Sequence, residues 1–155
     1  MKYLLSLLLC IFSTVVFAED GFPKGCQPIS IVDDPLILKT AKPPVIAFMH
    51  NVSSSEIWVT HPVKEPSASA GWSSKLQGGN WSALAVQDET FELSCIESRP
   101  GHEQQIPCGS VIAVCVWSGV KMPTGDGTYW AGEDMTLPAL TAHLGGRGFV
   151  LPTAQ

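Results

Sequence analysis

The sequence predicts a mainly β fold: a small, disulfide-linked β-sandwich or barrel-like domain with one short helix near its C-terminus. Three observations favour this class. Short apolar or alternating segments recur at near-regular spacing, with Gly-, Pro- and Asn-rich turns between them. The pattern changes to a helical period only near the end of the chain. Four of the five cysteines follow residue 18, an even number that suits two disulfides.

The first eighteen residues have the order of a secretory signal peptide. Lys2 precedes a short apolar run, and Val16-Phe17-Ala18 forms a cleavage site of the expected kind. We therefore expect a single exported domain, residues 19–155, in the periplasm or outside the cell. An uncleaved anchor and a lipoprotein cut before Cys10 are less favoured, because the run is short and the residue ahead of Cys10 is large.

The first half of the domain predicts strands after an irregular lead. The continuous apolar run at 45–49 predicts a strand buried on both sides, and a turn separates it from a strand at 56–61. We expect these two strands to form a hairpin. Two further short strands are predicted at 28–32 and 36–39, on either side of a turn at Asp33-Asp34-Pro35.

The second half continues the pattern. Residues 62–72 contain two prolines and predict a surface or edge loop. Further strands are predicted at 81–86, 91–95, 128–130 and 148–151, with the strongest, and most central, at 111–117. Thr136 as N-cap, the Leu137, Leu140 and Leu144 stripe and the stop at Gly145-Gly146 predict a helix at 137–144.

The mature cysteines are Cys26, Cys95, Cys108 and Cys115. Sequence alone allows three pairings. The predicted strands favour Cys95 with Cys108, which closes the mouth of a polar loop, and Cys26 with Cys115, which fixes the lead to a central strand. No C-x-x-C spacing supports a redox or metal site.

Composition and motifs exclude several functions. The formal net charge is −5 at pH 7 and the basic residues are scattered singly, which disfavours nucleic acid as a partner. No later segment is apolar for long enough to span a membrane. The four histidines lack metal-site spacing, no nucleophile motif occurs, and the paired acids lie in predicted turns. We therefore expect no catalytic residue, cofactor or metal.

Two features predict an interaction surface. Trp72 lies in a polar, Gly/Ser-rich stretch, whereas Trp81 and Trp117 lie in apolar strands and should belong to the core. The longest polar loop, within 96–107, is expected to be closed by a disulfide and is a suitable recognition element. The candidate contact residues are Trp72, Arg99, His102, Glu103 and Gln104.

Several segments resemble the enhanced entry protein B (EnhB) family of gammaproteobacteria over roughly residues 45–150. They are Gly71-Trp72 through Lys75-Leu76, Asn80-Trp81-Ser82-Ala83, Phe91-x-x-x-Cys95, Ile106-x-Cys108, Val114-Cys115-x-Trp117 and Tyr129-Trp130. The resemblance implies an exported protein associated with entry into host cells or with the bacterial envelope. It brings no catalytic residue set.

Together these observations predict a non-enzymatic periplasmic or secreted protein whose partner is another envelope or secreted protein. Two alternatives remain. One is a cell-wall or carbohydrate-active enzyme, or a carbohydrate-binding module, and the other is a periplasmic metal-binding protein built on the histidines.

Overall fold

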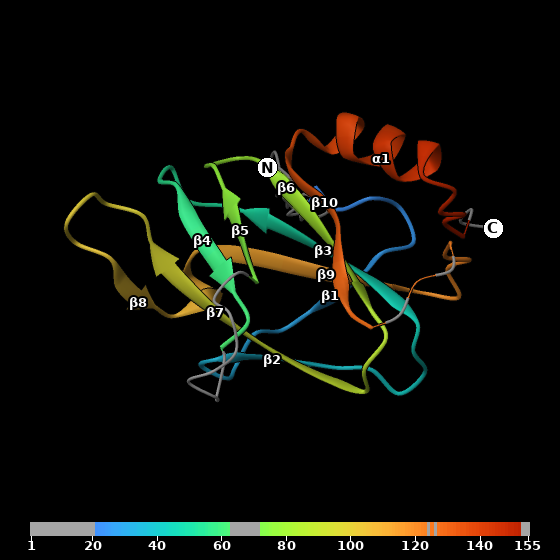
Figure 1. Cartoon of the computed structure of the whole chain (residues 1–155), viewed down its shortest axis with the longest axis horizontal. Helices are drawn as coiled ribbons and strands as arrows, with labels where there is room; N and C mark the ends of the chain where they lie inside the picture. The colour runs from blue at the N-terminus through green and yellow to red at the C-terminus, as the bar shows by residue number, and fades with distance from the viewer. Residues whose placement is uncertain (1–20, 63–71, 124, 126, 153–155) are drawn as a thin grey trace, which may run out of the picture.

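The computed structural model describes residues 21–62, 72–123, 125 and 127–152. The predicted signal peptide, residues 1–18, lies outside the described residues, as does nearly all of the predicted loop at 62–72. The described chain is mainly β, with two facing antiparallel sheets that do not close into a barrel (Figure 1). The predicted fold class is confirmed as an open, two-layered arrangement.

The first sheet holds five strands. In spatial order they are β1 (Gln27–Ile29), β9 (Ile112–Ser118), β3 (Val45–Asn51), β6 (Trp81–Val86) and β10 (Tyr129–Met135). The second sheet has β2 (Leu36–Lys39), β7 (Thr90–Glu97), β4 (Ile57–Thr60) and β5 (Ser73–Leu76), and β8 (Gln104–Ile106) pairs with β7. A 3-10 turn, Cys108–Ser110, precedes β9, and the helix α1 (Leu137–Gly146) follows β10.

The central strand β3 is buried on both sides, as its continuous apolar run predicts. Val45, Ala47 and Met49 face the second sheet and join the core between the layers. Ile46 and Phe48 point to the outer face, where they belong to a second core that includes Leu140 and Leu144 of α1. The helix thus forms a partial third layer, visible above β6 and β10 in Figure 1.

One glycine allows the helix to pack closely. A Cβ atom at Gly132 on β10 would collide with the end of the Leu140 side chain, so a larger residue there would force this buried side chain of α1 to move. The helix begins where predicted, but Thr136 makes no side-chain capping bond. It also continues through Gly145-Gly146, and the chain turns away at Gly148, whose φ is +88°.

Several predicted elements are wrong. Strands β3 and β4 do not form a hairpin, because the turn after Asn51 carries the chain from one sheet to the other. β8 forms in part of the predicted polar loop, and β5, with the polar sequence SSKL, lies in a segment for which the sequence predicted no element. The last predicted strand, 148–151, is reduced to a single bridge between Lys121 and Val150. In each case pairing with a neighbour, rather than local pattern, decided the outcome.

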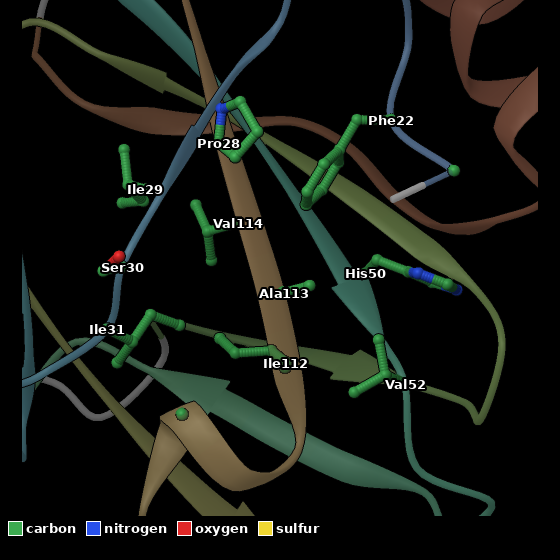
Figure 2. Close-up of a pocket in the computed structure, with 12 residues that line it drawn as sticks. Phe22, Pro28, Ile29, Ser30, Ile31, His50, Val52, Ile112, Ala113 and Val114 are labelled. Carbon is green, nitrogen blue, oxygen red and sulfur yellow. The ribbon is translucent and has the colours of Figure 1, made fainter. Parts of the chain in front are cut away.

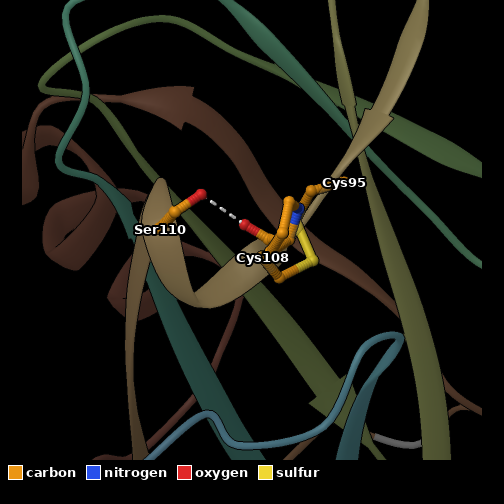
Figure 3. The surroundings of a disulfide bond; sticks show 4 residues. Cys95, Cys108 and Ser110 are labelled. Carbon is orange, nitrogen blue, oxygen red and sulfur yellow. Dashed lines mark hydrogen bonds between the residues drawn. A yellow bond between two sulfur atoms is a disulfide. The ribbon is translucent and has the colours of Figure 1, made fainter.

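Two disulfides cross-link the fold, one between the N-terminal lead and β9 and one between β7 and the 3-10 turn that precedes β9. Cys26 is bonded to Cys115, which fixes the N-terminal lead on the outer face of the first sheet. Cys95 on β7 is bonded to Cys108 at the start of the 3-10 turn, where Ser110 Oγ donates a hydrogen bond of 2.7 Å to Pro107 O (Figure 3). These are the two pairings that the predicted strands favour.

Candidate functional site

An open groove of about 540 Å³ lies on the outer face of the first sheet. Figure 2 shows Ala113 of β9 in its middle, with His50 and Val52 on one side and Pro28 and Ser30 on the other. Its volume is within the range of ordinary ligand pockets. The groove therefore offers room for a small ligand or for a side chain of a partner.

The groove exists because the outer face of the sheet is only partly covered. On β3 and β9, the outward residues Ile46, Phe48, Cys115 and Trp117 are buried under α1 and the N-terminal lead. The next outward positions, His50 and Ala113, are register partners and remain partly exposed. Because the side chain of Ala113 is small, the surface is hollowed at this position, which forms the floor of the groove.

The N-terminal lead forms one wall. Phe22 packs edge-on against Trp81 of β6, with the ring centroids 5.8 Å apart. Four residues later, Cys26 is bonded to Cys115, which lies on the same outer face of the sheet beside the groove. The wall that Phe22 supplies is thus fixed by a covalent bond to the sheet beneath it.

The groove is uncharged and mostly apolar. The lining residues among the described part of the chain include no Lys, Arg, Asp or Glu. His50 stacks on Trp81 with the ring centroids 4.1 Å apart and the planes 3° from parallel. Burial lowers the pKa of His50 from its ordinary value of 6.5, although a hydrogen bond with the Gly79 backbone acts in the opposite direction. The imidazole is therefore predominantly neutral at pH 7. Val52, which is 55% exposed, adds apolar surface at the rim.

The predicted contact residue Trp72 lies elsewhere, in a half-buried aromatic cluster. Its ring stacks on Trp130 at 5.1 Å and lies 5.0 Å from Phe91, while His61 stacks on Phe91 at 4.4 Å. Both Trp72 and Trp130 pack against the core between the sheets. The cluster closes one end of the sandwich, so only part of Trp72 remains available for contact.

The other predicted contact residues lie at the opposite end of β4. Trp72 is hydrogen-bonded through its carbonyl to His61, just after Thr60, whereas Glu97, next to the loop, pairs with Ile57. Arg99 forms an ion pair of 2.8 Å with Glu97. The four predicted contact residues of this region, Arg99, His102, Glu103 and Gln104, are all exposed, and Gln104 lies within β8 rather than in a loop. The structure therefore does not bring Trp72 and the loop into one surface.

The remaining sequence predictions concern tryptophans, metals and membranes. Trp81 and Trp117 belong to the core, with exposed fractions of 5% and 6%. Within the described ranges, no three His, Cys, Asp or Glu residues are grouped to hold a metal ion. In the same part of the chain, no helix combines the length and apolar character needed to cross a membrane.

Sequence reasoning missed the groove. Its residues come from the lead, from β1 and the two residues after it, from His50 and Val52 around the end of β3, from the 3-10 turn and from the start of β9. None of them belongs to a chemically distinctive motif. The one sequence signal was His50, a polar residue in an outward position near the end of an otherwise apolar strand. It indicates that the layer formed by α1 and the lead does not extend over that end of β3.

Comparison with known proteins gives no match: no protein-family model fits the chain, and neither a curated protein nor a solved structure is significantly similar to it. The resemblance to the EnhB family thus stays a prediction from the sequence motifs.

Proposed function

We propose that residues 19–155 act as a non-enzymatic binding protein of the bacterial envelope, periplasmic or secreted, which holds an uncharged apolar segment of another envelope or secreted protein in the groove. Two disulfides in the fold are consistent with an oxidising compartment, such as the periplasm or the cell exterior. The sequence resemblance to the EnhB family supports the same location. The association of that family with host-cell entry suggests a biological context for the binding, and the proposal assigns no role in entry itself.

The observation that carries this proposal is the groove itself. It combines an apolar rim at Val52, a neutral His50 and a floor without charge among its described residues. A charged ligand would lose its hydration there without gaining an ionic partner. An apolar side chain would instead gain burial against Phe22 and Val52, at about 25 cal/mol per Å² of apolar area.

The test is a cross-linked pull-down from envelope extract with the oxidised protein. Ala113→Arg places a long charged side chain on the groove floor and should abolish capture of the specific partner. Val150→Arg is the matched control, because Val150 is also exposed, at 57%, but does not line the groove. Equal capture by both variants, or no specific partner for the wild-type protein, would contradict the proposal.

The enzyme alternative requires two carboxylates facing a cleft, about 5–10 Å apart. The lining of the groove includes no carboxylate among its described residues. The geometry therefore favours binding at this site over hydrolysis.

A further inference from the structure

The outer face of the second sheet presents one exposed aromatic ring. Trp58 on β4 is 36% exposed and is the most exposed of the five tryptophans. Its neighbours on the strand, Ile57 and Val59, are fully buried in the core, so the alternation of the strand places the indole on the opposite face. This face lies on the other side of the sandwich from the groove.

The indole is held by a chain of polar contacts. Trp58 Nε1 donates to Ser98 Oγ at 3.0 Å, and Ser98 Oγ donates to Glu56 Oε1 at 2.9 Å. The second carboxylate oxygen, Glu56 Oε2, is 2.7 Å from Lys75 Nζ. The hydrogen bonds of Lys75 and Ser98 lower the pKa of Glu56, so the carboxylate stays ionised. A ring fixed in this way loses little freedom when a ligand stacks on it.

Strand register places four different side chains in one row across this face. The row consists of Lys75, Trp58, Ile96 and Gln105, on β5, β4, β7 and β8. At about 4.8 Å between neighbouring strands, it extends over roughly 14 Å. The next row holds the hydroxyl residues Ser73, Thr60 and Ser94, of which Ser94 is buried.

The composition of these two rows selects a class of ligand. The charge of Lys75 is balanced by Glu56, which disfavours a polyanion such as nucleic acid. One aromatic and one aliphatic side chain are too few for an amphipathic helix, which needs a continuous apolar stripe. A pyranose ring, in contrast, presents an apolar C–H face for stacking and a rim of hydroxyl groups for hydrogen bonds.

We propose that this face binds a chain of N-acetylated hexosamine units of the kind that builds the bacterial cell wall. One pyranose ring stacks on Trp58, and the acetamido group of a unit places its methyl on Ile96 and its amide beside the Gln105 amide. Lys75 and Thr60 supply hydrogen bonds to ring substituents. This proposal is independent of binding in the groove, because the groove lies on the other sheet. The two proposals have in common only that the chain is exported.

The test is a titration of the ¹⁵N-labelled, oxidised protein with the tetramer of N-acetylglucosamine. We expect the Trp58 indole signal and the amides of its row to shift, with a Kd below about 10 mM. Trp58→Ala should weaken binding at least tenfold, and Gln105→Ala several-fold. Val150→Ala, at an exposed residue outside both the groove and this face, is the control and should bind as the wild type does.

Folding of each variant is checked by its unfolding transition. Should Trp58→Ala fail to fold, Gln105→Ala and Lys75→Ala carry the test, because both side chains are exposed. No shift at 10 mM tetramer, or unchanged binding by all folded variants of the row, would overturn the proposal. Equal affinity for the glucose tetramer, which lacks the acetamido group, would overturn its assignment to an N-acetylated chain.

Discussion

Removing the Cys26–Cys115 disulfide should destabilise the protein more than removing Cys95–Cys108. The first bond closes a separation of 89 residues and the second a separation of 13. If a disulfide acts by restricting the unfolded chain, the entropy that it removes grows with the logarithm of loop length. The expected losses at 25 °C are about 4.6 kcal/mol for the first bond and about 2.9 kcal/mol for the second.

Paired alanine variants make this comparison well matched. All four cysteines are buried, with exposed fractions of 6% for Cys26 and 0% for Cys95, Cys108 and Cys115. Loss of sulfur packing is therefore similar in the two double variants, and the difference of about 1.7 kcal/mol reflects loop length. Urea unfolding of each double variant gives its free energy of unfolding. In thermal unfolding, the midpoint temperature should fall by roughly 15 °C without Cys26–Cys115 and by roughly 10 °C without Cys95–Cys108.

Equal losses, or a larger loss for Cys95→Ala/Cys108→Ala, would refute the loop-length argument and point to packing in the folded state instead. A second readout concerns the groove. Without Cys26–Cys115, the amides of β1 should exchange hydrogen faster, because the three strand residues and the contact of Phe22 with Trp81 then hold the lead without a covalent bond.

Two further predictions concern single side chains, the buried Asn51 and the half-buried His50. Asn51 is fully buried; its Nδ2 donates to Ser55 O and Leu76 O, and its Oδ1 accepts from Ser53 N and Ser53 Oγ. Asn51→Ala should therefore lower the free energy of unfolding by about 4 kcal/mol, at about 1 kcal/mol for each hydrogen bond lost; a loss below about 1 kcal/mol in urea unfolding would contradict this. The second concerns pH: because the pKa of His50 is lowered in the fold, the unfolded chain takes up a proton first as the pH falls below about 7. The stability contribution of His50 is thus present above its ordinary pKa of 6.5 and is lost as the pH falls through the folded value. Unfolding free energies measured at several pH values should show this decline in the wild type, and His50→Phe should remove it; an identical decline in the variant would assign it to another group.

The sequence was most informative where burial follows from residue type alone. The apolar run of β3, the alternation in β7 and the Leu stripe of α1 each predicted a correct element. The cysteines were informative for a related reason, since their positions beside strands limited which pairs could meet.

The candidate sites were less accessible to sequence reasoning. Trp72 was identified as a contact residue from its polar neighbours, yet packing on Trp130 and Phe91 buries part of it. Strand alternation with Ile57 and Val59 places Trp58 on the outer face, but only the register with Lys75 and Ile96 shows which side chains share that face with it.

By itself, the sequence determined that this chain is a mainly β protein with a late helix and cysteines placed for two disulfides. The tertiary structure decided which strands are neighbours, and with them the groove at Ala113 and the row around Trp58. The physical reason is that a hydrophobic pattern records whether a side chain is buried, but not what it is buried against. Strand β3 has the same pattern whether its turn leads to a hairpin or to the opposite sheet, and the pairing energy that separates these outcomes comes from residues distant in the sequence.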